Sequence, residues 1–358
     1  LLAQHRFDDY RSKKDEATRG QRVLVTSEAA NIDSVVGQAE ATALVRDLVD
    51  TPAADLGPAE LEAAVADLAR SSGGQLRVTS GDKLIESYPL IAAVGGAATP
   101  QRAPRLLELE WGKPDDPRVA IVGKGVCFDS GGLDLKTASG MRIMKKDMGG
   151  AAHALAIARL VIENRLPIRL HLVIPAVENA VSGASYRPGD IVKSRKGLFV
   201  EIDNTDAEGR LILADALARA AEEKPELIID FATLTGAARV ALGPDLPATF
   251  VNRDDLAADL ESAARDVDDP IWRMPLWDAY DEDLKSNVAD LSNTSGNAMA
   301  GAIYAALFLR RFVPDDIPWA HLDTWAWREP GKPGRPKGGD ALGLRAVSAL
   351  LERRYQQS

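Results

Sequence analysis

Two stretches of the sequence consist almost entirely of apolar residues, VAIVG at 119–123 and LIIDFA at 227–232. A strand with one face in water alternates apolar and polar residues, whereas a strand covered by helices on both faces is a continuous apolar run. Segments with helical spacing of apolar residues separate these runs from the other strand candidates. The pattern therefore predicts an α/β fold with a mixed, largely parallel central sheet flanked by helices.

The expected elements follow from this alternation. Apolar residues at helical spacing predict a first helix from Asp33 to just before Thr51, and Gly57-Pro58 starts a second. Further helices are expected at about 148–163, 208–222, 254–266, 300–312 and 341–354. Strands are expected at 76–80, 105–111, 118–123, 170–177, 198–202, 227–233, 248–252 and 319–323. The segment 328–343 is rich in Pro, Gly and Lys, so we expect a loop near the C-terminal helix.

The first 32 residues differ from the rest of the chain. They are highly charged, contain one short strand-like run, RVLVT at 22–26, and begin with neither Met nor a signal-peptide pattern. We expect 1–32 to be the tail of a preceding domain plus a connector. Residues 33–358 are then expected to form the main domain, and they are numerous enough to bury a large core.

Charge and composition exclude several classes of partner. Acidic residues outnumber basic ones 53 to 43 and no basic run is long, which argues against a nucleic-acid footprint. No apolar run approaches the roughly 20 residues that span a bilayer. The single cysteine, Cys127, cannot form an intrachain disulfide and fits a reducing compartment. We expect a cytoplasmic protein without membrane or nucleic-acid partners.

Charged residues gather among glycines in two segments, 122–150 and 203–217. The charged residues of interest are Lys124, Asp129, Lys136, Asp147, Asp206, Glu208 and Arg210. Carboxylates brought together repel one another, and their pKa values rise unless cations lie between them. The cluster therefore predicts either a metal site or a salt-bridged surface, and we favour the metal site.

The residue types indicate which kind of metal site this would be. The chain has only four histidines and no HExxH motif, so the ligands would be mostly oxygen atoms, and four acids suit two divalent ions better than one. In an extended chain, Asp206 and Glu208 would point to the same face, and Gly209 would let the backbone turn into the following helix. Asp147 precedes a helix start, so a plain N-cap is its alternative role.

The basic residues of these segments have separate expected roles. Lys124 directly follows a buried strand and could reach a metal, whereas Lys136 could stay protonated and stabilise a developing oxyanion. Lys145 and Lys146 are expected to be solvated. For Arg210, a bound oxyanion and a simple salt bridge are equally good interpretations.

Three runs together resemble one family. NTDAEGRL at 204–211, VGKGVCFDSGG at 122–132 and KKDMGGAA at 145–152 are similar to the leucyl aminopeptidases, which are cytosolic, hexameric exopeptidases with two metal ions. The similarity extends from about Val45 to about Leu351. It implies a zinc-exopeptidase-like catalytic domain within 33–358, a homo-hexamer, two divalent metal ions, either Zn²⁺ or Mn²⁺, and bicarbonate.

The resemblance also implies a role for each residue of the cluster. The ligands of the tighter metal would be Lys124, Asp129, Asp147 and Glu208. The more exchangeable metal would be held by Asp129, by Glu208, and by both the carboxylate and the main-chain carbonyl of Asp206. Lys136 would polarise the scissile carbonyl and stabilise the tetrahedral intermediate, and Arg210 would anchor bicarbonate as the base. Peptides with a free N-terminus would be the substrates, in a pocket lined by Met144, Asn204, Thr233, Leu234 and Gly236.

The sequence departs from the family in WAHLDTWAWREP, where better-known relatives carry a small residue soon after HLD. We expect core packing for at least one of Trp325 and Trp327, and Trp325 would reshape the first side-chain pocket if it faced the site. Cys127, His153 and His171 are expected to be structural.

Three other functions are weaker. FDSGG resembles a serine-protease motif and would make Ser130 a nucleophile, but no histidine has a triad-like setting. A two-metal phosphoesterase would also use clustered acids, yet the acidic charge of the chain repels polyanions. A non-catalytic assembly protein of the same fold is the third alternative.

Overall fold

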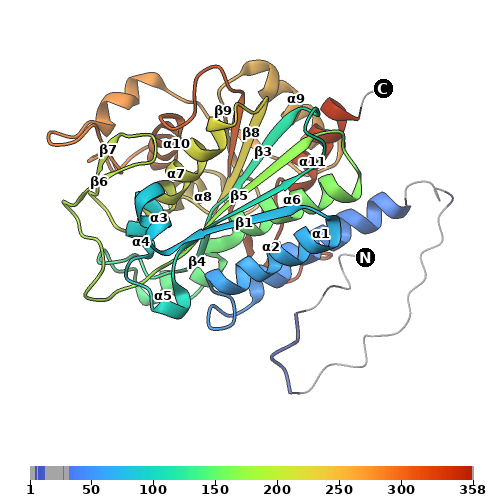
Figure 1. Cartoon of the computed structure of the whole chain (residues 1–358). Coiled ribbons are helices and arrows are strands. Elements are labelled where there is room, and N and C mark those ends of the chain that lie inside the picture. Colours follow the sequence, from blue (N-terminus) through green and yellow to red (C-terminus); the bar gives the residue numbers. More distant parts are fainter. Residues whose placement is uncertain (1–4, 6, 13–26, 28–31, 357–358) are drawn as a thin grey trace.

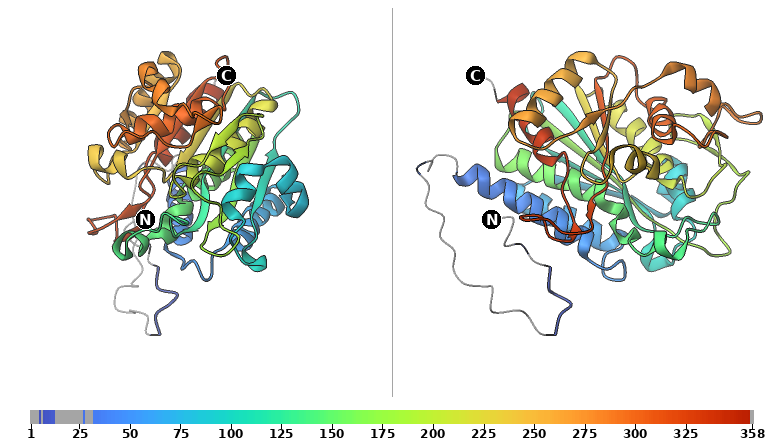
Figure 2. Two further views of the ribbon diagram at one scale, coloured as in Figure 1. Left: turned by 90° about the vertical axis from the view of Figure 1, so that its left-hand side faces the viewer. Right: turned by 180° about the vertical axis from the view of Figure 1, so that it is seen from behind.

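The computed structural model describes residues 5, 7–12, 27 and 32–356. A nine-stranded sheet forms the centre of the molecule, and helices cover both of its faces (Figures 1 and 2). The predicted α/β class is thus confirmed. The strand predicted at 22–26 lies outside the described residues. Within the described part of the chain, no helix has the length and apolar character needed to cross a bilayer.

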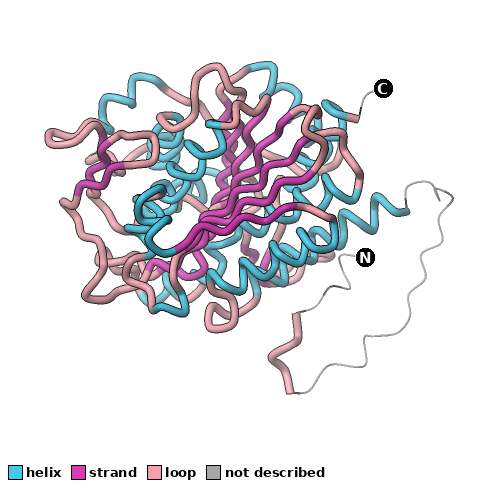
Figure 3. The backbone as a smooth tube through the Cα atoms, in the orientation of Figure 1, coloured by secondary structure: helices cyan, strands magenta, loops and turns pink. Residues whose placement is uncertain are grey.

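The strands of the central sheet lie side by side (Figure 3), with parallel pairs in the middle and antiparallel pairs on either side of them. Strand order is β1-β2-β5-β3-β8-β12-β9-β10, with β4 also paired to β5. Strands β5, β3, β8 and β12 run parallel to one another, whereas β2 is antiparallel to β5 and β9 to β12. The strand bounds are β1 Gln75–Ser80, β2 Arg105–Trp111, β3 Arg118–Gly123, β4 Gly125–Asp129, β5 Arg169–Asn179, β8 Leu227–Ala232, β9 Ala248–Val251, β10 Trp272–Arg273 and β12 Trp319–Asp323.

Two smaller sheets lie outside the central one. The strand predicted at 198–202 is β7 (Phe199–Glu201), and it pairs with β6 (Ile191–Lys193) and β11 (Leu291–Ser292). Strands β13 (Trp327–Arg328) and β14 (Gly338–Gly339) form the second small sheet, within the segment predicted as a loop.

All the predicted helices are present within a few residues of their expected bounds. The α-helices are α1 Ile32–Asp50, α2 Pro58–Ser72, α3 Gly81–Ser87, α4 Pro89–Gly95, α5 Ala138–Met141, α6 Gly149–Glu163, α7 Glu208–Glu222, α8 Gly236–Leu242, α9 Asp254–Asp266, α10 Gly301–Arg310 and α11 Leu344–Tyr355. The 3₁₀ helices are η4 Pro100–Arg102, η5 Met144–Met148 and η6 Asp278–Leu284. The sequence did not predict the short helices α3, α4, α5 and α8, because seven residues or fewer give too little periodicity.

Alternate residues of the central strands enter two separate cores. On β3, Val119 and Ile121 pack with α1, α2, α6, α9 and α11, while Ala120 and Val122 pack with α4, α7 and α10. Successive side chains of a strand point to opposite faces, so a strand between two helical layers must be apolar throughout. This double burial explains the runs VAIVG and LIIDFA, and it makes the sheet a rigid frame for the loops at its carboxyl edge.

A buried acid ties this frame to α7. Glu108 on β2 is 2% exposed, accepts hydrogen bonds from Arg77 at 2.9 and 2.6 Å, and lies 2.8 Å from Arg219 Nε on α7. His171 Nε2 lies 3.2 Å from the same carboxylate, which confirms a structural role for this histidine. Burial alone would raise the pKa of Glu108, but the His171, Arg77 and Arg219 contacts lower it to about 2.

We expect Glu108→Gln to lower the free energy of unfolding by about 3 kcal/mol at pH 7, because Arg219 would lose a buried partner. The pKa of Glu108 is about 2 in the folded chain and 4.5 in the unfolded chain. The stabilisation that its ionised carboxylate gives the folded chain is therefore complete above pH 4.5 and is lost as pH falls toward 2. Urea unfolding at pH 7, 4.5 and 3.5 should show the difference from wild type shrinking with acid. The exposed Glu86→Gln serves as the control, and a difference that does not depend on pH would contradict the assignment.

Candidate metal centre

The carboxyl ends of the central strands bring the charged segments together, as expected for an open α/β sheet. Lys124 separates β3 from β4, Asp129 ends β4, and Thr233 directly follows β8. The backbone of Lys124 is held on both sides, because its N–H donates to Phe231 O at 3.0 Å and its carbonyl accepts from Ala151 N at 2.8 Å. The direction of the lysine side chain is therefore set by the sheet and by the first turn of α6.

The first group of charges surrounds Lys124. Its Nζ lies 2.9 Å from Asp147 Oδ2 and 2.8 Å from Glu208 Oε1, and it donates to Thr233 O at 2.9 Å. Thr233 Oγ1 in turn donates to Asp147 Oδ1 at 2.7 Å. All four residues are buried. Burial opposes the charge on Lys124, but Asp147 and Glu208 outweigh it and raise the pKa of the ammonium.

Gly209 leaves the space that Lys124 occupies. A Cβ at this position would lie 2.6 Å from Lys124 Cε and 2.7 Å from Nζ, closer than a side chain can be. The predicted extended chain at Asp206–Glu208 is wrong, because residues 205–206 form a turn and Glu208 is the first residue of α7. Gly209 therefore lets the lysine between β3 and β4 approach the first turn of α7, and it does not serve a bend out of extended chain.

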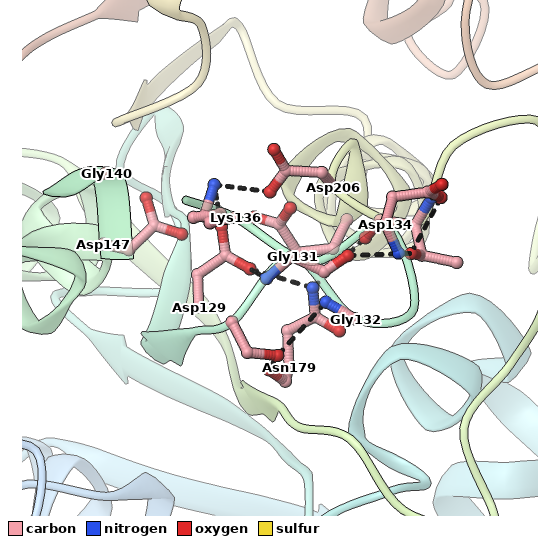
Figure 4. A network of polar contacts seen from close by, with 12 residues as sticks. Asp129, Gly131, Gly132, Asp134, Lys136, Gly140, Asp147, Asn179 and Asp206 are labelled. Atoms are coloured by element: carbon pink, nitrogen blue, oxygen red, sulfur yellow. Dashed lines mark hydrogen bonds and ion pairs between the residues drawn. The ribbon is translucent and has the colours of Figure 1, made fainter. Parts of the chain in front are cut away.

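The second group of charges surrounds Lys136 (Figure 4). Its ammonium lies 2.8 Å from Asp129 Oδ2 and also contacts Asp206 Oδ1. Asp129, Asp206 and Glu208 each offer one oxygen, and these oxygens lie within 4.8 Å of one another. Burial and then the charge of Asp129 raise the pKa values of both Asp206 and Glu208. The two groups thus share Glu208 and form one continuous site.

The donor set fits divalent cations. Four carboxylates face two ammonium groups here, so the buried cluster carries an excess of negative charge. Asp147 Oδ2, Asp206 Oδ1 and Glu208 Oε1 are buried and form ion pairs with the lysines. A carboxylate oxygen has two lone pairs, so each of these atoms can still accept a further ligand. Oxygen ligands of this kind, from several rigid elements, are what two hard or borderline dications require.

A shell of uncharged residues supports these carboxylates, and the sequence did not reveal it. Asn179, the last residue of β5, donates from Nδ2 to Asp129 Oδ1 at 2.9 Å and to Thr205 O at 3.1 Å. Tyr186 also donates to Thr205 O, at 2.6 Å, and Thr205 Oγ1 lies 3.0 Å from Asp134 Oδ2. The position of Asn179 at the end of a buried strand was the signal that could have identified it.

The sequence also did not reveal the role of Asp323, which is the last residue of β12. It accepts the backbone N–H of Leu234 at 3.1 Å and of Thr235 at 3.1 Å, and it also accepts the Thr235 hydroxyl. These bonds fix the loop from 233 to 236, which contains three of the predicted pocket residues. Leu234 is partly buried, whereas Gly236 is exposed at the first position of α8.

The segment before α6 excludes the alternative role of Asp147 and corrects one expectation. Asp147 is not an N-cap, because α6 starts at Gly149 after Met148, and the Asp147 carboxylate points to Lys124 and Thr233. The expected solvation of the neighbouring lysines is also wrong. Lys146 is 2% exposed with its Nζ 4.0 Å from the centre of the Trp325 ring, and Lys145 donates to Asp50 O.

The two tryptophans hold this segment in place. Trp327 is 9% exposed within a hydrophobic core, which confirms core packing for one of the pair, and it lies 5.7 Å from Lys145 Nζ. Trp325 is partly buried against the same core while its ring covers Lys146. No ion pair with Lys146 occurs among the described residues, and burial lowers the pKa of this lysine to about 8.

Arg210, Asn204 and Met144 lie around the charged groups. Arg210 is buried and donates from Nη1 to Asn293 O at 2.7 Å, while its Nε has no hydrogen-bond partner among the described residues. Burial lowers the pKa of Arg210 to about 10. Within that part of the chain it forms no salt bridge. Asn204 Oδ1 accepts from Asp206 N at 2.7 Å, and Met144 is buried at the start of η5.

Ser130, Cys127 and His153 have structural surroundings rather than places in the charged cluster. Ser130 Oγ donates to Asn179 O at 2.7 Å and accepts from Gly132 N, with no histidine beside it among the described residues. Cys127 is buried, and burial raises its thiol pKa. His153 lies between Gly149 O and Leu342 N, at 2.7 and 3.0 Å, which confirms its structural role.

Comparison with known proteins gives one consistent family. Residues 43–348 match the cytosol aminopeptidase family, catalytic domain. The chain is 43% identical to the probable cytosol aminopeptidase of Syntrophotalea carbinolica, over 98% of this chain and 73% of that protein. The crystal structure of the cytosol aminopeptidase from Coxiella burnetii has 55% identity and a TM-score of 0.90, over 91% of this chain and 71% of that one. The bottromycin maturation enzyme BotP in complex with Mn has 37% identity and a TM-score of 0.92, over 99% and 77%.

We expect Lys146→Met to stabilise the metal-free protein at pH 7 by about 1–3 kcal/mol, because it removes a buried ammonium without a carboxylate partner. Folding lowers the pKa of Lys146 from 10.5 to about 8. The destabilisation of the folded chain by this buried ammonium is therefore complete below pH 8 and decreases as pH rises toward 10.5. Urea unfolding in chelator at pH 7 and pH 10 should show the gain shrinking with pH. Lys113→Met, at an exposed lysine, is the control. Destabilisation by Lys146→Met at pH 7 would show that the stacking on Trp325 outweighs burial.

Proposed function

This chain belongs to the cytosol aminopeptidase family, and we propose that it removes the N-terminal residue from peptides with the help of two divalent metal ions. The observation that supports the proposal is the convergence of four carboxylates from separate elements on Lys124 and Lys136. A salt-bridged surface would leave such groups in water, whereas these are mostly buried and carry excess negative charge.

We assign the ligands to two overlapping sets. The tighter ion would be held by Asp129, Asp147, Glu208 and Lys124, and the ammonium of Lys124 would have to release its proton to become a ligand. Asp129 and Glu208 would also hold the exchangeable ion together with Asp206, through its carboxylate and its main-chain carbonyl. Zn²⁺ and Mn²⁺ both suit these donors, and the solved complex of BotP with Mn supports a divalent ion. When bound, the ions would supply Lewis acidity for the free α-amine of the peptide and for the attacking water.

Lys136 would stabilise negative charge on the substrate. Burial opposes its charge, but Asp129 and Glu208 outweigh burial and raise its pKa, so the group remains an ammonium. Its side chain is 16% exposed, which leaves it open toward the site. A preorganised cation at this point would donate to the carbonyl oxygen of the scissile bond as that oxygen becomes an oxyanion.

Arg210 would hold the base. The carboxylates of the site are all assigned to the metal ions, so a proton acceptor must come from elsewhere. Arg210 lies on the first turn of α7, buried, with a guanidinium that has one hydrogen bond to protein and no ion pair within the described chain. Its planar fork suits bicarbonate, which would supply the missing base.

The substrate pocket would lie between η5 and the loop after β8. Met144, Thr233, Leu234 and Gly236 come from these two segments, and Thr233 joins them through its bonds to Asp147. Asn204 would complete the pocket from the loop before α7. We further propose that the protein works in the cytoplasm as a homo-hexamer, which size-exclusion chromatography with light scattering would test.

The alternatives predict different substrates. A phosphoesterase would have to bring a phosphate anion into a site where four carboxylates already face two lysines. A binding-only protein would not need to bury carboxylate oxygens whose contacts within the described chain are ion pairs with lysines. These observations favour peptide hydrolysis over both.

We expect metal-dependent hydrolysis of leucyl p-nitroanilide, no cleavage of its N-acetylated form, and no cleavage of a phosphodiester. The amide must present a free amine, because the proposed site binds the substrate through it. Activity should disappear in chelator and return with Zn²⁺ or Mn²⁺, and metal analysis should find two ions per chain. Asp206→Ala should lower both metal content and activity, whereas Asp115→Ala, at an exposed acid, should not. Rapid hydrolysis of the acetylated amide, or of the phosphodiester, would contradict the proposal.

We expect Arg210→Met to lower kcat by about 10²-fold and to abolish activation by bicarbonate, because the anion would lose its anchor. Activity is measured in degassed buffer with bicarbonate added stepwise, for wild type and for both Arg210→Met and Arg210→Lys. The lysine variant keeps a cation and should retain part of the response. An unchanged bicarbonate response in the methionine variant would rule out this role for Arg210.

A further inference from the structure

A buried asparagine outside the predicted site contacts two residues that were predicted to belong to it, Asn204 and Arg210. Asn293 directly follows β11 and is fully buried. Strand β11 runs parallel to β7, and Asn293 N donates to Glu201 O at 2.9 Å, so the pairing places Asn293 beside the residues that follow β7. Those residues form the loop that carries Asp206.

The side-chain amide of Asn293 clamps the start of that loop. Its Oδ1 accepts the backbone N–H groups of Asp203 at 2.8 Å and Asn204 at 3.2 Å, and its Nδ2 donates to Asn204 O at 2.7 Å. Asn204 Oδ1 then accepts from Asp206 N at 2.7 Å. A continuous chain of hydrogen bonds therefore runs from Asn293 through Asn204 to the backbone of Asp206.

The main chain of Asn293 holds Arg210. Asn293 O accepts from Arg210 Nη1 at 2.7 Å, and this is the hydrogen bond to protein that the Arg210 side chain makes within the described residues. The position of the guanidinium thus depends on the same residue that fixes Asp206. Groups that orient metal ligands or charged catalytic groups in this way typically change activity or metal affinity 10- to 100-fold when they are removed.

We propose that Asn293 is a positioning residue that sets Asp206 and Arg210 relative to each other. The proposal rests on the proposed function, because it assigns Asp206 to a metal and Arg210 to the chemistry. A side chain with both an acceptor and a donor is required at this place. Aspartate would keep the acceptor for Asp203 and Asn204 but would set an oxygen against Asn204 O, and alanine would lose all three bonds.

A second asparagine provides the matched control. Asn252 Oδ1 accepts from Trp319 N at 2.7 Å and its Nδ2 donates to Ile317 O at 2.9 Å, so it clamps the backbone at the start of β12 in the same manner. This strand start lies at the opposite end of β12 from Asp323. Asn252→Ala should therefore remove similar hydrogen bonds without disturbing the charged groups.

The test compares Asn293→Ala, Asn293→Asp and Asn252→Ala with wild type in thermal unfolding, in steady-state kinetics with saturating metal, and in calorimetric titration of the metal-free protein with Mn²⁺. We expect the two alanine variants to have similar melting temperatures. Asn293→Ala alone should lose 10- to 100-fold in kcat, with KM changed less than threefold, and should bind the weaker ion 10- to 100-fold less tightly. Asn293→Asp should be intermediate.

Two results would overturn the inference. One is Asn293→Ala with kcat and Mn²⁺ affinity both within threefold of wild type, and the other is an equal loss of kcat in Asn252→Ala. Wild-type protein that binds Mn²⁺ but does not hydrolyse leucyl p-nitroanilide would instead contradict the proposed function. In that case the titration still tests Asn293, because it does not depend on turnover.

Discussion

Buried carboxylates can stay together only when cations lie between them, and the site of this protein depends on that constraint. Lys124 joins Asp147 to Glu208, and Lys136 joins Asp129 to Asp206. Without these ammonium groups, repulsion and desolvation would separate the loops. The two lysines balance only part of the charge, so they hold the ligands in place while leaving negative charge for metal ions.

The surrounding structure serves to bring such groups close without strain. Gly209 allows α7 to begin against the Lys124 side chain, and the apolar strands keep the loop anchors rigid. Glu108 connects the edge of the sheet to Arg219 near the far end of α7. At the near end of that helix, Asn293 and Asn179 hold the loop that leads into it. Hydrogen bonds from uncharged side chains thus help to position the charged groups of the site.

Two lysines next to the proposed ligand Asp147 are paired with two tryptophans. Lys145 and Lys146 both lie over indole rings, those of Trp327 and Trp325 respectively. The contact joins η5, which contains Asp147, to the segment after β12. A buried lysine on an indole face is less favourable than one in water, so this arrangement places a stability cost next to the ligands.

The sequence by itself determined the α/β class, the buried strands and the identity of the clustered residues, because continuous apolar runs and glycine-rich acidic loops are local signals. It also placed Lys124 directly after one buried strand and Thr233 at the end of another, where a sheet collects its loops. Only the tertiary structure decided that Lys146 is buried, that Gly209 makes room for Lys124, and that Asn293 supports Asp206. Each of these depends on contacts between segments far apart in the chain, and periodicity and composition carry no information about such contacts.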